Sequence, residues 1–204
     1  MIDLSGRVAL VTGGARGVGR GIATRLLDAG ATVVICGRNA PESLPTSSDG
    51  DRSTRALRVA DVRDADAVDA LIAGIVDDLG RLDIVVNNAG GTPVVAAAEA
   101  TARFSTKIVE LNLLSALHVA TAARHRMVTQ PEGGCIVNIT SMSGIRPSPG
   151  SAAYGAAKAG LASLTGSLAM EWAPKVRVNA VAAGMVRTEM FEEYYGGPEG
   201  AAAV

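Results

Sequence analysis

Short apolar runs alternate with longer segments of helical period along most of this 204-residue chain. The runs RVALVT, TVVICG and LDIVVNNAG alternate with the helical segments GRGIATRLLDAG and ADAVDALIAGIVDDLG. Continuous runs rich in β-branched residues are typical of strands that are covered on both faces. The alternation therefore predicts repeated βαβ units in an α/β fold, a Rossmann-type doubly wound parallel sheet.

The same pattern continues towards the C-terminus. We expect a helix over residues 105–127, a strand over GCIVNITS, a helix over residues 151–172 and a strand over VRVNAVAAG. Residues 39–54 are rich in Pro, Ser, Asp and Gly, which predicts a long loop, with a short helix as the alternative. No second-domain boundary is visible, so a single domain is expected.

Composition limits the classes of function. A net charge of -1 offers no electrostatic attraction for nucleic acid or for an anionic membrane. No apolar run reaches the roughly 18 residues of a spanning helix, and the N-terminus does not read as a secretory signal. The two cysteines and two histidines suggest neither a disulfide framework nor a metal site, and a cytoplasmic location is expected. Cys36, in an apolar run, is interpreted as a small buried residue.

A glycine-rich turn, TGGARGVG, links the first predicted strand directly to the first helix. Glycines there allow a tight turn and close approach of a pyrophosphate, which would face the helix N-terminus. A tight turn without a ligand is the alternative. The turn predicts dinucleotide binding by Gly13, Ala15, Arg16, Gly17, Val18 and Gly19.

The end of the second predicted strand bears on the choice of cofactor. An acid there would bind the 2′-hydroxyl of NAD, but this chain has Gly37 and then Arg38. The guanidinium of Arg38, helped by Arg16, can pair with a 2′-phosphate, which favours NADP(H) over NAD(H). The alternative is a solvated Arg38 that only stacks on the adenine.

Two further segments follow predicted strands. Asp61, followed by Val62, is placed to accept a hydrogen bond from the adenine amino group, or else to cap the next helix, a role that Asp64 can also fill. In the NNAG turn, side-chain amides can tie strands together and leave Asn88, Ala89 and Gly90 beside the cofactor.

The sequence YGAAK places Tyr154 and Lys158 four residues apart on one predicted helix, so their side chains share a face. An ammonium beside a tyrosine lowers the phenol pKa from about 10 towards working pH. Ser141, just past the strand GCIVNIT, is placed to donate to a carbonyl oxygen, with Ser143 as its competitor. The structural alternatives are a solvated lysine beside a ring and turn-stabilising serines.

Asn112 interrupts the apolar stretch IVELNLLSALHVA, and a buried amide needs hydrogen-bond partners. It either bonds its own helix backbone and kinks the helix, or holds a water that passes protons to Lys158. His118 and His125 on the same helix are assigned to packing or solvent.

Together, TGGARGVG, Asp61, NNAG, Asn112, Ser141 and YGAAK resemble, in order and separation, the short-chain dehydrogenase/reductase family over residues 5–190. The resemblance implies a catalytic tetrad in which Tyr154 exchanges the proton, Ser141 orients the substrate oxygen, Lys158 binds the nicotinamide ribose and Asn112 anchors a water. It also implies a nicotinamide contact from Gly184, Val186 and Thr188, and a homodimer or homotetramer.

The chain departs from the family pattern in two places. Ala183 and Gly184 stand where the family has Pro and Gly, and the family's last helix and strand have no counterpart in the sequence. We therefore expect an NAD(P)-binding domain over residues 1–190 that lacks this helix and strand, followed by a truncated or disordered tail over residues 191–204.

These observations predict an oxidoreductase that transfers a hydride between NADP(H), or NAD(H), and a ketone or secondary alcohol. The loops at residues 91–100, 143–150 and 184–197 lack convergent charges, which favours an apolar small-molecule substrate. A 3-oxoacyl thioester reductase is the alternative within this class. A non-catalytic NAD(P)-binding sensor and an inactive truncated fragment are the alternatives outside it.

Overall fold

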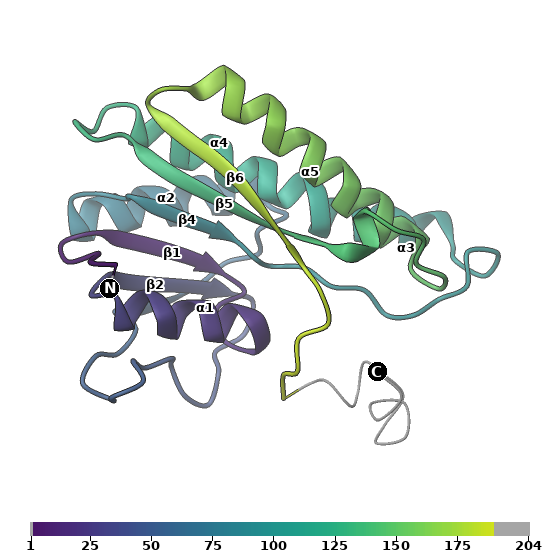
Figure 1. The fold of residues 1–204 in the computed structure, drawn as a ribbon, viewed down its shortest axis with the longest axis horizontal. Coiled ribbons are helices and arrows are strands. Elements are labelled where there is room, and N and C mark those ends of the chain that lie inside the picture. The colour runs from purple at the N-terminus through teal and green to yellow at the C-terminus, as the bar shows by residue number, and fades with distance from the viewer. Residues whose placement is uncertain (1, 190–204) are drawn as a thin grey trace.

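The computed structural model describes residues 2–189, which form one parallel six-stranded sheet with helices on its faces (Figure 1). The strand order is β3-β2-β1-β4-β5-β6. This confirms the predicted doubly wound α/β fold, and the order reverses between β1 and β4, where ligands bind in such sheets. The strands are β1 (Val8–Thr12), β2 (Thr32–Gly37), β3 (Ala56–Val59), β4 (Ile84–Asn87), β5 (Gly134–Ser141) and β6 (Val176–Ala183).

The helices divide between the two faces of the sheet (Figure 1). α1 (Gly17–Asp28) packs on one face, while α2 (Ala65–Leu79), α4 (Ser115–Met127) and α5 (Ala152–Trp172) pack on the other. α3 (Ala102–Val109) runs into α4 through a π-helical turn at Glu110–Leu114, and a 3-10 turn at Met142–Gly144 follows β5. The helical region predicted over residues 105–127 begins three residues earlier, at Ala102. Thr101 caps it, because its side chain accepts a hydrogen bond from Phe104 N at 3.1 Å.

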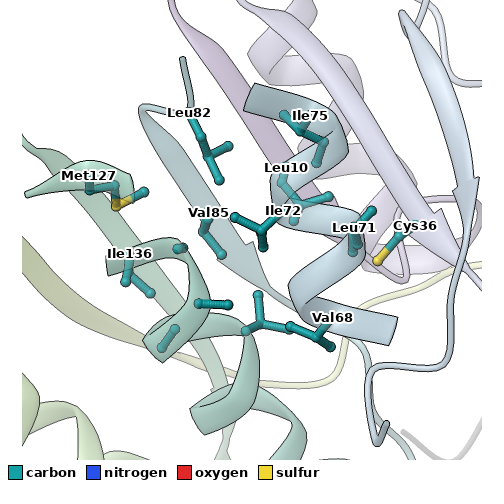
Figure 2. Packing of buried hydrophobic residues seen from close by; sticks show 14 of the residues in the cluster. Leu10, Cys36, Val68, Leu71, Ile72, Ile75, Leu82, Val85, Met127 and Ile136 are labelled. Carbon is teal, nitrogen blue, oxygen red and sulfur yellow. The ribbon is translucent and has the colours of Figure 1, made fainter. Parts of the chain in front are cut away.

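The larger core cluster lies between the sheet and α2 and α4, and Figure 2 shows its closely packed aliphatic side chains. On α2 the buried residues recur at intervals of three and four, which places them on one face of the helix. Burying each such side chain contributes about 1.5–3 kcal/mol. The cluster includes Leu10, Cys36, Val68, Leu71, Ile72, Ile75, Leu82, Val85, Met127 and Ile136.

β6 is an edge strand of the sheet formed by residues 2–189. No helix among these residues covers the α1 side of β5 and β6, where Val181 is 54% exposed. Within residues 2–189, the cover expected on both faces is therefore incomplete at these two strands, although Ile139 of β5 packs against the α1-side cluster. Residues 191–204, the predicted tail, lie outside the described residues.

The connection over residues 39–54 is a loop with one isolated antiparallel bridge, so the short-helix alternative is wrong. Polar contacts hold this loop on α1: Arg20 Nη1 donates to Ser43 O at 3.0 Å, and Thr24 Oγ1 donates to Thr46 O at 2.9 Å. In residues 2–189 no helix has the length and apolar character needed to cross a membrane.

Candidate functional site

The glycine-rich turn lies at the carboxyl end of β1, at the switch point of the sheet. Gly13 has φ +64°, and a Cβ on Gly19 would lie 2.3 Å from Gly13 O, so only glycine fits there. Asn88 Nδ2 donates to Thr12 O at 3.0 Å and to Gly13 O at 3.2 Å. The NNAG turn after β4 therefore holds the glycine-rich turn in place.

The N-terminus of α1 offers backbone donors to an anion. Its N-cap residue, Arg16, makes no side-chain cap hydrogen bond, and the first turn contains no acid. One anionic group of the chain already binds there: Glu189 Oε1 accepts a hydrogen bond from Gly17 N at 2.6 Å. The geometry fits a dinucleotide phosphate. Ala15 and Arg16 lie in the turn, while Gly17, Val18 and Gly19 begin the helix.

Side chains after β2 and β3 mark the expected adenosine end. A Cβ on Gly37 would meet only Asn39 O, at 3.9 Å, and Arg38 is exposed. Asp61 accepts from Arg63 Nε at 3.0 Å and from Arg63 Nη2 at 2.5 Å. The hydrogen bonds from Arg63 outweigh partial burial and hold the pKa of Asp61 below its usual value, with a smaller contribution from the charge of Arg38.

Asp64, not Asp61, caps α2: its carboxylate accepts from Asp66 N at 3.0 Å and Ala67 N at 3.1 Å. The capping alternative for Asp61 is therefore wrong. Val62, between them, is buried. Sequence reasoning missed Arg63, whose position two residues after an acid is the only local signal for this ion pair.

Lys158 is buried in α5, with 4% of its surface exposed. Its Nζ donates to Ile139 O at 2.7 Å and lies 5.7 Å from the centre of the Tyr154 ring. Burial lowers the pKa of Lys158 to about 8. A Cβ on Gly90 would lie 3.3 Å from this Nζ and 2.6 Å from Asn112 Oδ1, so the end of β4, the π turn and α5 meet in one small volume.

Asn112, in the π turn, is fully engaged with backbone. Its Oδ1 accepts from Gly91 N at 2.9 Å, while Nδ2 donates to Gly91 O at 3.0 Å and to Ile108 O at 2.9 Å. The structure therefore supports the predicted bond of Asn112 to its own helix. The distortion is a π turn, in which the helical spacing widens by one residue.

Ser141 is the last residue of β5 and pairs with Ala183 of β6. Its Oγ accepts from Ser143 N at 3.2 Å, which stabilises the 3-10 turn, and no hydrogen bond donated by this hydroxyl is found within residues 2–189. Ser143 Oγ accepts from Ser148 Oγ at 3.1 Å, in a cluster that also includes Ser151. Ser141 is thus bonded to the backbone of the 3-10 turn, whereas Ser143 is bonded to another serine hydroxyl.

A cavity of about 70 Å³ adjoins Tyr154, between residues 92–105 and residues 150–154. Its lining includes Val95, Ala97 and Phe104, and no charged side chain of residues 2–189 lines it. The hydrogen bond from Val95 N to Gly150 O, at 2.8 Å, joins the two walls. The cavity therefore suits a small uncharged group.

Exposed apolar side chains lie in the loops that follow β4, β5 and β6. Val94, Ile145, Met185 and Val186 are 74%, 67%, 53% and 46% exposed. Gly184, Val186 and Thr188 lie after β6, and a Cβ on Gly184 would meet nothing within 4 Å. Among residues 2–189 no cluster of His, Cys, Asp and Glu is suited to hold a metal ion.

A doubly wound sheet with a glycine-rich turn at its switch point defines a dinucleotide-binding protein. The family model of the short chain dehydrogenases matches residues 7–197, and the chain belongs to this family. It is therefore an NAD(P)-dependent oxidoreductase that acts on alcohol or ketone groups.

Similar proteins carry different substrate names. The chain is 37% identical to a 3-oxoacyl-[acyl-carrier-protein] reductase of Synechocystis sp., over 94% of this chain and 79% of the relative. It is 34% identical to a D-threitol dehydrogenase of Mycolicibacterium smegmatis, over 97% and 76%. The crystal structure of carveol dehydrogenase from Mycobacterium avium, in complex with NAD, superposes with a TM-score of 0.85 at 29% identity, covering 98% and 82%.

Proposed function

We propose that this enzyme transfers a hydride between NADP(H) and a ketone or secondary alcohol, with Tyr154 as the proton-transfer residue. The observation that carries the proposal is the buried Nζ of Lys158, 5.7 Å from the Tyr154 ring and next to Gly90. A buried ammonium favours a phenolate over a phenol. Burying an ammonium costs desolvation free energy. Such perturbed groups are common at active sites, here one where a tyrosine gives up and regains a proton.

Each residue has a separate role in the reducing direction. The bound cofactor supplies the hydride. Tyr154 donates its phenolic proton to the carbonyl oxygen, and Lys158 stabilises the phenolate that results. The Ser141 hydroxyl keeps its proton and donates a hydrogen bond to the same oxygen as negative charge develops there. Asn112 acts by positioning, because it holds the backbone at Gly91 beside the site.

The cofactor is held along the carboxyl ends of β1 to β4 and beside the segment that follows β6. The N-terminus of α1 binds the pyrophosphate, and the residues matching the family pattern after β4 and β6, Asn88 to Gly90 and Gly184 to Thr188, line the nicotinamide half. Asp61 and Val62 face the adenine. NADP(H) is preferred over NAD(H) because Arg38 and Arg16 are exposed cations at the positions where a 2′-phosphate is expected.

The substrate is an uncharged, mostly apolar ketone or secondary alcohol. Among residues 2–189 no charged side chain lines the cavity beside Tyr154, and the loops after β4, β5 and β6 carry four exposed apolar side chains. A 3-oxoacyl thioester is the second candidate, favoured by the 37% identity to the Synechocystis reductase. A single domain over residues 1–190 and assembly into a homodimer or homotetramer stay predictions.

Substitution of Tyr154 by Phe tests the mechanism. NADPH oxidation is followed with a panel of apolar ketones and 3-oxoacyl thioesters, and NADPH affinity is followed by nicotinamide fluorescence. We expect Tyr154→Phe to lower kcat by about 10²–10⁴-fold while the NADPH Kd stays within about twofold. An unchanged kcat would remove Tyr154 from the mechanism. Binding by the wild type without turnover of any substrate would instead support a nucleotide sensor.

A further inference from the structure

The N-termini of α1, which follows β1, and α2, which follows β3, are capped differently. Asp64 caps α2 with its own side chain, whereas Arg16 makes no cap hydrogen bond at α1 and no acid lies in the first turn of α1. Backbone N–H groups at a helix start need an acceptor, and the helix dipole favours a negatively charged one. α1 therefore lacks a local partner for its first amide.

That partner comes from the far end of the described chain. Glu189, 172 residues away, accepts the hydrogen bond of Gly17 N at 2.6 Å. Its neighbour Thr188 also lies over the turn, with Cγ2 3.7 Å from the position of a Cβ on Gly17. The segment after β6 thus crosses the glycine-rich turn and places a carboxylate on it.

Electrostatics keep this carboxylate ionised. The Gly17 N–H holds the pKa of Glu189 below its usual value, and the positive charges of Arg20 and Arg16 lower it further. Arg20 also donates to Ala15 O at 3.4 Å, so it belongs to the same turn. A carboxylate and a phosphate offer the same chemistry to this helix end, an anionic oxygen acceptor.

We propose that Glu189 is an internal competitor of the cofactor pyrophosphate. In the free enzyme its carboxylate occupies the phosphate position at α1, and it leaves when the dinucleotide binds. This inference rests on the proposed function, which assigns that helix end to the pyrophosphate. Release of Glu189 also breaks a contact between the glycine-rich turn and the segment that carries Gly184 and Val186, so cofactor binding and the arrangement of the nicotinamide contacts are coupled.

The competition is measured with NADPH titrations of the full chain by nicotinamide fluorescence. Glu189→Gln keeps the size of the side chain and removes its charge, and Glu189→Ala removes the contact as well. Asp77→Asn is the matched control, since Asp77 is an exposed acid on α2 with the same change in net charge. We expect both Glu189 variants to lower the NADPH Kd about three- to tenfold, and the control to leave it unchanged.

The possible failures are distinguishable. If the wild type binds NADPH and neither Glu189 variant binds it more tightly, Glu189 is not a competitor, while the proposed function stands. An equal gain in Asp77→Asn would show a general charge effect and would also overturn the inference. If neither the wild type nor any variant binds NADPH or NADH, the proposed function falls and the competitor role falls with it.

Discussion

The side-chain amide of Asn112 forms two hydrogen bonds with the backbone of Gly91: Oδ1 accepts from the Gly91 N–H at 2.9 Å, and Nδ2 donates to the Gly91 carbonyl at 3.0 Å. A third hydrogen bond, to Ile108 O at 2.9 Å, ties the same amide to its own helix. One buried residue therefore joins the loop after β4 to the π turn. The position of Gly91 depends on this amide rather than on a strand or helix.

Substitution of Asn112 by Ala should affect both stability and catalysis. Loss of three hydrogen bonds leaves buried or partly buried backbone groups without these partners, and we expect the free energy of unfolding to fall by about 2–3 kcal/mol. Because the loop beside the cofactor shifts, kcat should fall as well. Urea unfolding and steady-state rates measure the two effects.

Ser115→Ala is the control for Asn112→Ala. Ser115 is equally buried one turn later, but its hydroxyl donates only to Leu111 O, at 2.6 Å, within the same helix. We expect a loss of about 1 kcal/mol or less and a normal kcat. If Asn112→Ala loses stability but keeps full kcat, the role of Asn112 is purely structural.

Ser141 and Ser143 form a matched pair for testing the oxyanion donor. Ser141→Ala should lower kcat by about 10²-fold, because its hydroxyl donates no hydrogen bond within residues 2–189 and can therefore donate one to a substrate oxygen. Ser143→Ala should stay within a few-fold of the wild type, since its hydroxyl serves the loop through Ser148. Both variants should keep the wild-type NADPH Kd. The opposite ranking of the two rates would assign the role to Ser143.

The buried charge of Lys158 should cost stability. Burial lowers its pKa from 10.5 to about 8, a difference that corresponds to roughly 3 kcal/mol at neutral pH. Lys158→Met removes this cost and also the hydrogen bond to Ile139 O. We therefore expect the variant to be inactive but more stable by about 1–2 kcal/mol at pH 7, as judged by urea unfolding.

The pH dependence gives this prediction a distinct signature. Between pH 8 and 10.5 the unfolded lysine keeps its proton while the native one loses it, so the unfolded state binds more protons. The free energy of unfolding of the wild type, relative to Lys158→Met, should therefore rise over this window and stay constant below pH 8. A flat difference would show that the Lys158 pKa is not lowered.

Arg38 and Arg16 should decide the choice between NADP and NAD. We expect Arg38→Ala to weaken NADPH binding by about 10–100-fold, and Arg16→Ala by a smaller factor, with little effect on NADH. Arg25→Ala is the charge-matched control, because Arg25 is an 80% exposed residue of α1 that pairs with Asp28. Isothermal titration of each variant with both cofactors measures the difference. Equal losses for NADPH and NADH would contradict a 2′-phosphate contact.

The sequence by itself determined the sheet, its parallel strands and the places where the candidate residues lie along them. Apolar runs and helical periods are local properties, and each predicted site residue sits at the end of a run or on a recognisable helix face. The i, i+4 spacing of Tyr154 and Lys158 is such a local signal. It predicted that the two share a helix face, and the 5.7 Å separation agrees.

Only the tertiary structure decided how these residues are partnered. The contact of Glu189 with Gly17, the bonds of Asn112 to Gly91 and the burial of Lys158 join segments that are far apart in the chain. A pKa or a hydrogen bond of this kind depends on desolvation and on which distant backbone groups packing brings close. No local pattern records that arrangement, because it exists only once the sheet has brought the ends of β1, β4, β5 and β6 to one edge.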